Sequence, residues 1–259
     1  MPDLPFYKPH QLLELQAGYC TVNPAYERLM FRYLSLRLTD EAAREYARHG
    51  FLRRLGTLKR SIENVYSIYP PKRFDKAARD ECLDLAINLQ SFLFNVFGCI
   101  DNLARVWVSE KQLKDNQGRP LRDQQIGLRS GCTAVRQTFS AEFQEYLNSR
   151  EDWLGYLENY RHALAHRIPL YVAPYTLSPS KLEEHNELER RKNEAQIKGD
   201  YRLWSTLNTE QEELGRFTPY MMHSFSEGAS PMPFHFQMLA DWNTVVEMAT
   251  RFFQEINSS

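Results

Sequence analysis

The chain has 259 residues, which is enough for one large domain or two small ones with a substantial buried core. Apolar residues make up 42% and aromatic residues 13%, a composition that excludes a disordered or purely solvating chain. The net charge of −1 excludes a protein that is basic overall, and four widely spaced cysteines exclude a disulfide-dense scaffold or a zinc ribbon.

The sequence contains no targeting or membrane signal that we recognise. Its first residues have no basic start followed by an unbroken apolar stretch, so we expect no secretory signal. The most apolar region, residues 85–108, is interrupted by Asn88, Asp101 and Arg105, which argues against a membrane span. We therefore expect a cytoplasmic protein with no membrane partner.

A first helix is predicted to begin at Glu41, with Thr39 or Asp40 as its cap. Apolar residues recur from there to Tyr69 at a mean spacing of about 3.7 residues, close to one helical turn. Two prolines directly after Tyr69 end the predicted helix.

The second predicted helix, from Ala78 to Trp107, has the clearest periodicity, at about 3.6 residues. Its opposite face also carries apolar residues, among them Ile87, Phe94 and Val108. A helix that is apolar nearly all round must be covered on both sides, so this segment is predicted to be a central helix or a dimer contact.

Three asparagines, Asn88, Asn95 and Asn102, recur every seven residues along the flank of this helix and form one polar stripe. Such stripes favour a role in packing register over a role in a functional site. Asp101 lies roughly opposite the apolar seam, where it would face solvent, a partner subunit or an arginine site.

Two further helices complete the predicted core, residues 39–170. After a long aperiodic connection at 111–130, a third helix is expected at 132–147 and a fourth from Trp153 to Leu164, ended by Pro169. Four consecutive helices predict an all-α fold built on an antiparallel four-helix bundle.

The predicted core is flanked by an N-terminal segment, residues 1–38, and by a C-terminal elaboration, residues 171–259. Residues 181–200 contain 11 charged side chains, which is typical of a solvated helix. Residues 215–233 are expected to form a loop, and residues 234–256 a last helix that packs back on the bundle. We expect one domain.

The end of the fourth predicted helix, YRHALAHRIPL at 160–170, combines an arginine with two histidines. Arginine binds a phosphate through two parallel hydrogen bonds, and histidine exchanges protons near neutral pH, so the segment indicates chemistry on a phosphodiester. Arg161 lies 140° around an ideal helix from His166. The two would converge if the helix unwinds before Pro169, or if a second subunit supplies the complement.

A metal site is the competing interpretation of the two histidines. His162 and His166 share a helix face with Glu158, but these three positions extend over about 12 Å, too far for one ion. The HExxH pattern and the glycine-rich nucleotide loops are absent from the sequence. We therefore predict neither a metal nor a cofactor.

The arrangement of Arg161, His162 and His166 resembles the motif of the HEPN superfamily: an arginine, a polar neighbour, and a histidine four to six residues on. The long helix with FNVFGCIDNLARVWV is also similar to the central helix of many such proteins. The resemblance covers roughly residues 39–170, and this chain has His162 where the common form has asparagine. Arg44 and His49 make a second match to the spacing, without that context.

Active members of the superfamily are metal-independent endoribonucleases that act as dimers around a shared cleft. The resemblance implies that His166 handles the proton of the ribose 2′-hydroxyl or the leaving oxygen, that Arg161 stabilises the phosphate charge, and that His162 positions one of them. It also implies a homodimer and an RNA partner, within a stress or defence system. The expected supporting or substrate-binding residues are Asp101, Asn102 and Glu158.

The alternative is a catalytically inert helical module that binds a protein or nucleotide partner. Arg161 would then pair with Asp101 or Glu158 inside the bundle, and the histidines would cap carbonyls at the helix C-terminus. Exposure separates the two hypotheses: an open, shared groove favours the ribonuclease, and burial with mutual pairing favours the inert module.

Overall fold

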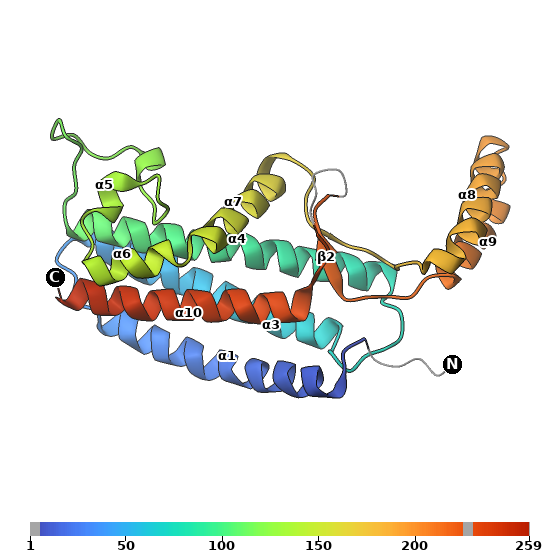
Figure 1. Ribbon diagram of the computed structural model, residues 1–259, viewed down its shortest axis with the longest axis horizontal. Helices are drawn as coiled ribbons and strands as arrows, with labels where there is room; N and C mark the ends of the chain where they lie inside the picture. Colours follow the sequence, from blue (N-terminus) through green and yellow to red (C-terminus); the bar gives the residue numbers. More distant parts are fainter. Residues whose placement is uncertain (1–5, 225–229, 259) are drawn as a thin grey trace.

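The computed structural model describes residues 6–224 and 230–258, and it is mostly helical, with three short strands (Figure 1). Four long helices run side by side and form the main hydrophobic core. They are α1 (Pro9–Ser35), α3 (Leu52–Ile68), α4 (Arg79–Glu110) and α10 (Phe234–Ser258). The expectation of a helical fold is confirmed, and α10 matches the predicted last helix.

The predicted helix from Glu41 is also confirmed, with one irregularity. Asp40 caps α2 (Glu41–Glu45), and its carboxylate accepts a hydrogen bond of 2.8 Å from the backbone N–H of Ala43. The chain then passes through one π-helical segment, η1 (Tyr46–Phe51), and continues directly into α3.

Helix α4 is the central helix of the bundle, and it contacts α3, α7 and α10. Its length and composition would suffice to cross a membrane, but half of its apolar window is buried within the bundle. The buried half of this window belongs to the hydrophobic core. Part of its outer face stays open, because Leu83, Ile87 and Phe94 are 56%, 63% and 48% exposed.

Helix α1 lies in the N-terminal segment, for which the sequence predicted no element. Its buried residues lie on one helical face, and Pro24, which is unfavourable within a helix, lies among them. They are Leu15, Val22, Ala25, Leu29 and Tyr33. Packing against α10 holds the helix together, and Tyr33 donates a 2.8 Å hydrogen bond to the carbonyl of Ala249 there. The bundle therefore combines helices from both ends of the chain, and the arrangement of four consecutive helices predicted within residues 39–170 is not confirmed.

The prediction of one helix at 132–147 is wrong, because two short helices occupy this stretch: α5 (Thr133–Arg136) and α6 (Ala141–Asn148). Ser140 separates them, since its hydroxyl oxygen accepts a 3.2 Å hydrogen bond from Phe143 N–H and so caps α6. The hydroxyl also donates to Glu255 of α10. The apolar spacing continues across the break, which explains why periodicity alone did not reveal it.

Helix α7 (Glu151–His166) confirms the fourth predicted helix, and the connection before α5 contains one short 3₁₀ turn, η2 (Asp123–Gln125). Helix α7 packs across α4, on the side of the bundle away from α1 (Figure 1). Its C-terminal end, which carries the motif, rises away from the long helices.

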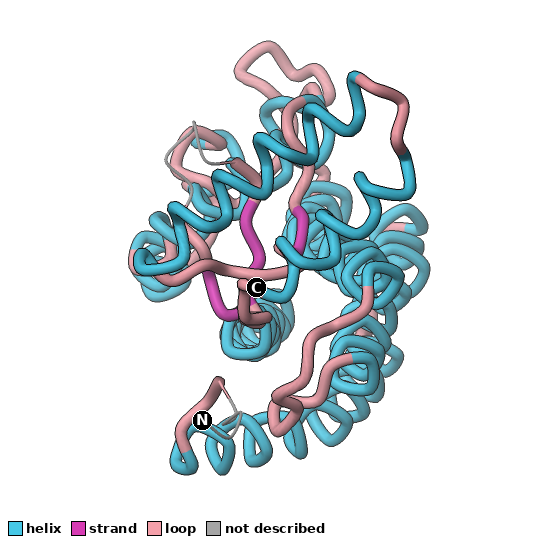
Figure 2. The backbone as a smooth tube through the Cα atoms, turned by 90° about the vertical axis from the view of Figure 1, so that its right-hand side faces the viewer, coloured by secondary structure: helices cyan, strands magenta, loops and turns pink. Residues whose placement is uncertain are grey.

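The prediction of a plain loop at 215–233 is wrong for its described part, and residues 225–229 lie outside the described residues. A small antiparallel sheet joins β1 (Tyr171–Val172), β2 (Tyr220–Met222) and β3 (Met232–Pro233), in that order (Figure 2). Tyr171 pairs with Met222, and Tyr220 pairs with Pro233. Strands of two or three residues are too short to show an alternating pattern in the sequence.

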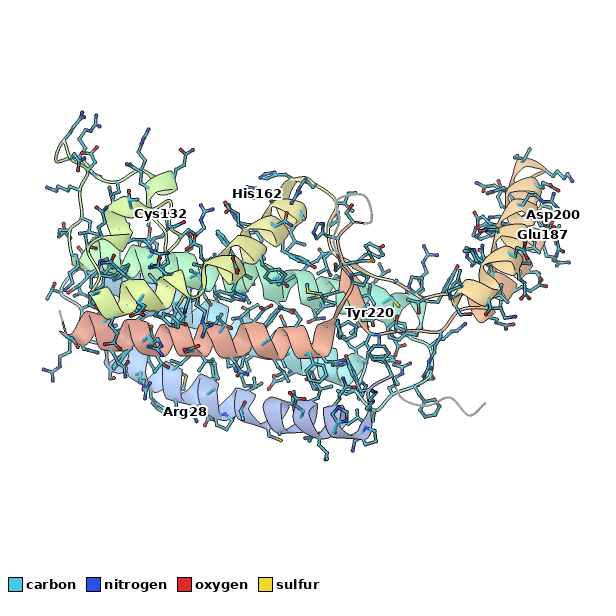
Figure 3. The ribbon with its side chains drawn as sticks, in the orientation of Figure 1. Arg28, Cys132, His162, Glu187, Asp200 and Tyr220 are labelled. Carbon is cyan, nitrogen blue, oxygen red and sulfur yellow. The ribbon has the colours of Figure 1, made fainter. Side chains whose placement is uncertain are left out.

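The charged segment forms α8 (Leu182–Ile197), after a single 3₁₀ turn η3 (Pro179–Lys181), and confirms the predicted helix. A second helix that the sequence did not predict, α9 (Tyr201–Glu213), folds back on α8 after Gly199, whose φ is +72°. This hairpin projects from the bundle, as the positions of Glu187 and Asp200 show (Figure 3). It has a small core of its own, formed by Leu188, Ala195 and Leu207 with Trp204 against them.

Candidate functional site

The motif occupies the C-terminal end of α7. Arg161, His162 and His166 are all exposed, and Figure 3 shows His162 on the part of α7 that rises away from the long helices. The helix ends at His166 because Arg167 leaves helical geometry, with φ −124° and ψ −142°. Pro169 follows two residues later and prevents the helix from resuming.

Arg161 reaches back to the central helix. Its guanidinium carbon lies 4.7 Å from the centre of the Phe97 ring, a cation–π contact with α4. No carboxylate in residues 6–224 and 230–258 forms an ion pair with this arginine. The buried pairing of Arg161 with Asp101 or Glu158 that an inert bundle would have is thus not present in the described chain.

Asp101 lies one helical turn beyond Phe97, on the same side of α4. It lines a cavity of about 30 Å³, room for one water, together with Phe97, Leu154 and Leu157. Burial raises the pKa of the Asp101 carboxyl, and the nearby positive charges of Arg105 and Arg161 partly offset this. The Nε of Arg105 is 3.8 Å from its carboxylate. Asp101 therefore has Arg105 of its own helix as its ion-pair partner, and Arg161 contributes only a weaker electrostatic effect.

The two histidines and Glu158 form one row along α7, as their spacing predicted. His162 Nε2 is 3.6 Å from Glu158 Oε1, and the rings of His162 and His166 are 6.5 Å apart. Although burial opposes it, the hydrogen bond from Arg129 keeps the pKa of Glu158 below its usual value. Glu158 is therefore ionised and lies next to His162. His166, at the helix end, forms no ion pair with a described residue.

Asn102 lies on a different side of α4 from Asp101, since consecutive helical residues are 100° apart. Its side-chain oxygen accepts a 3.1 Å hydrogen bond from Arg54 Nε on α3, and Asn95 accepts a 3.0 Å bond from Arg54 Nη1. Asn64 of α3 likewise donates to Asn88 at 2.8 Å. The asparagine stripe thus joins α4 to α3, and Asn102 does not meet the motif.

Three residues near these groups were missed by the sequence interpretation: Phe97, Arg129 and Arg54. Phe97 carried only the signal of an apolar flank position on α4. Arg129 belongs to the aperiodic connection, so no spacing argument could place it beside Glu158. Arg54 was one of several scattered cations on a helix, and only its pairing with the asparagines distinguishes it.

A single chain presents the arginine and the histidine of the motif on different sides of α7, in agreement with the 140° between them. Arg161 faces Phe97, whereas the nearest described aromatic neighbour of His166 is His162. Within the described residues, no three histidine, cysteine or acidic side chains are grouped so that they could hold a metal ion. Bringing Arg161 and His166 onto one phosphate requires a second surface.

Comparison with known proteins does not identify a family for this chain. The chain matches no protein-family model, no curated protein and no solved structure with which it was compared. The site must therefore be interpreted from its own residues.

Proposed function

We propose that this protein is a metal-independent endoribonuclease of the HEPN type, which acts on RNA as a homodimer in the cytoplasm. The observation that carries the proposal is the exposure of Arg161 and His166 at one helix end, with Arg161 free of any carboxylate partner in the described chain. The charge of such an arginine is available to an anionic substrate. Four free cysteines fit a reducing compartment.

The proposed chemistry needs one base and one cation. The imidazole of His166 takes the proton of a ribose 2′-hydroxyl, and the resulting oxygen attacks the adjacent phosphorus. The bond to the 5′-oxygen breaks, this oxygen takes a proton from water, and a 2′,3′-cyclic phosphate remains; the proton on His166 passes to the hydroxide that is formed. Arg161 stabilises the charge on the phosphate oxygens through two parallel hydrogen bonds. DNA has no 2′-hydroxyl and is not cleaved by this route.

The partner of Arg161 comes, in this proposal, from a second copy of the chain. The exposed face of α4 offers the contact, because Leu83, Ile87 and Phe94 lie on one side of the helix and Phe94 is one turn from Phe97. Covering each of these half-exposed side chains would contribute roughly 1 kcal/mol. A two-fold axis at this face would place Arg161 of one copy opposite His166 of the other.

An inert module that binds a protein or nucleotide partner is the second candidate. It is favoured by one observation: the cavity beside Phe97 and Asp101 is lined by neither Arg161 nor His166. In that case the exposed end of α7 would serve recognition without chemistry.

The test is cleavage of labelled single-stranded RNA in excess EDTA by wild type, Arg161→Ala and His166→Ala. We expect each substitution to lower the rate by at least about 100-fold, because each removes a group that acts on the reacting phosphate. Arg60→Ala and His10→Ala, at exposed positions on α3 and α1, are the matched controls and should cleave like wild type. Far-UV circular dichroism verifies folding.

Mixing the two inactive variants tests the shared site. If each site takes Arg161 from one copy and His166 from the other, half of the randomly paired dimers carry one intact site. The mixture then recovers about a quarter of wild-type activity, whereas a site within one chain recovers none. Equal cleavage by all variants would point to contamination or another site. A folded wild type that cleaves no RNA in a broad pool would establish the inert module instead.

A further inference from the structure

A separate cavity of about 500 Å³ opens where η1, α3 and α4 meet, and it contains none of the motif residues. Its volume is in the range of small-molecule sites. The side chains that give it chemical character are His49, Arg53, Arg54, Asn95 and Asn102, with Glu45 as its acid. Of these residues, the sequence interpretation assigned a function to Asn102 alone, as a supporting residue of the α7 motif.

Arg54 is held in one orientation at the wall of this cavity. Asn95 and Asn102 fix it through Nη1 and Nε, and its guanidinium lies against the backbone of α4 at Gly98. A Cβ atom at Gly98 would be 2.5 Å from that guanidinium, so only glycine leaves it room. A guanidinium has five N–H groups, and the two asparagines use two of them. The remaining edge is preorganised to donate hydrogen bonds.

The π-helical turn completes the cavity. Gly50 in η1 packs against Asn102, where a Cβ would lie 2.9 Å from the amide, and this close approach brings η1 against α4. His49 Nδ1 is 3.2 Å from Arg53 Nη2. An arginine can only donate, so Nδ1 accepts in this contact, and the ring N–H at Nε2 is a further donor. Turns of this kind are frequent at functional sites.

The polar groups of the cavity select an anion. Arg53 and Arg54 contribute two positive charges against one negative charge from Glu45, and neither arginine forms an ion pair within residues 6–224 and 230–258. The asparagine oxygens already accept from Arg54, so the groups left over at that wall are mainly donors. A phosphate monoester has the charge and the acceptor oxygens that match two guanidinium groups.

We propose that this cavity is a binding site for a phosphate monoester, with Arg54 as the fixed anchor and Arg53 and the Nε2–H of His49 as donors at the rim. The ligand is inorganic phosphate itself or the phosphate of a mononucleotide. The site goes beyond RNA cleavage and does not depend on it, because Arg161 and His166 lie outside the cavity.

The experiment is calorimetric titration of the full chain with inorganic phosphate, with adenosine monophosphate and with adenosine. Gly98→Ala is the decisive variant, since the added methyl displaces the guanidinium without removing a charge. Arg54→Gln is the second variant. We expect both to weaken phosphate binding at least tenfold. Gly155→Ala on α7 adds the same methyl where nothing lies within 4 Å, and Arg60→Gln removes an arginine from the same helix as Arg54. Both controls should bind within twofold of wild type.

The outcomes distinguish a mononucleotide from inorganic phosphate as the ligand, and they distinguish the cavity from the α7 motif as the binding site. Tighter binding of adenosine monophosphate than of phosphate, with no binding of adenosine, identifies a nucleotide; equal binding identifies phosphate alone. Arg161→Ala and His166→Ala should bind as wild type does, whatever their effect on RNA. The inference is overturned if the folded wild type binds neither phosphate at millimolar concentration, or if Gly98→Ala and Arg54→Gln bind as tightly as wild type.

Discussion

Asp241, in α10, is predicted to make the stability of this protein depend on pH. Its side chain is 1% exposed, and its Oδ1 accepts hydrogen bonds from Trp153 Nε1 at 2.8 Å and Gln237 Nε2 at 2.9 Å. Its Oδ2 is buried with no hydrogen-bond partner in the described chain. Burial raises the pKa of this carboxyl to about 7, although the two hydrogen bonds oppose the change.

The size of the effect follows from the two protonation equilibria. The unfolded chain releases the proton near the ordinary pKa of 3.8, whereas the folded chain keeps it until about pH 7. Folding stability is therefore unaffected by Asp241 below about pH 4, falls as the pH rises to about 7, and is constant above. The total loss is about 4 kcal/mol, a large part of the stability of a typical domain.

Asp241→Asn keeps an oxygen that accepts from Trp153 and Gln237 but cannot ionise. We expect the unfolding free energy of this variant minus that of wild type to increase by about 3 kcal/mol from pH 5 to pH 8. The comparison with wild type matters because buried His235 acts in the opposite direction. Burial lowers the pKa of His235 to about 3, so stability from His235 is lost as the pH falls below about 6.5.

Urea unfolding followed by far-UV circular dichroism at pH 5, 6.5 and 8 measures this difference. Asp84→Asn is the matched control, since Asp84 is exposed on α4, and its difference from wild type should not change with pH. The reasoning is refuted if the difference between Asp241→Asn and wild type is the same at all three pH values.

Three further predictions concern the dimer face and the local structure. In the proposed dimer, Phe94→Asp should abolish dimerisation, measured by light scattering, without lowering the melting temperature. Leu13→Asp on exposed α1 should have no effect on dimerisation. A dimeric Phe94→Asp would exclude this face. Ser140→Ala should cost about 1–2 kcal/mol in urea unfolding through loss of the α6 cap, and an unchanged midpoint would contradict that role. Gly199→Ala should cost about 1 kcal/mol, seen as faster hydrogen exchange confined to α8 and α9, because φ is +72° there; uniform exchange would argue against a local effect.

The sequence by itself determined the elements whose signals are local and repeated. Helices α4 and α10 and the combined α2, η1 and α3 were predictable because apolar residues recur at helical spacing over many turns. Asp40 could be identified as a cap because its hydrogen bond joins residues three apart. The same holds for the motif, since Arg161 and His166 belong to one short helix segment.

The remaining elements needed contacts between distant parts of the chain. Helix α1 depends on packing against α10, more than 200 residues away, as the bond from Tyr33 to Ala249 shows. The strands β1, β2 and β3 exist only as partners in one sheet. The break before α6 was hidden because the spacing of apolar residues continued through it.

The candidate sites divide in the same way. The sequence showed which groups the motif contains, but the tertiary structure decided that Asp101 lines the small cavity beside Phe97 while Asn102 turns to Arg54. Neighbouring residues on α4 point 100° apart, so their roles depend on which helix packs on each side. The proposed phosphate cavity also depends on tertiary contacts, because Gly98 and Gly50 are needed only where α3 and η1 pack against α4. No local sequence pattern specifies which helices will pack together.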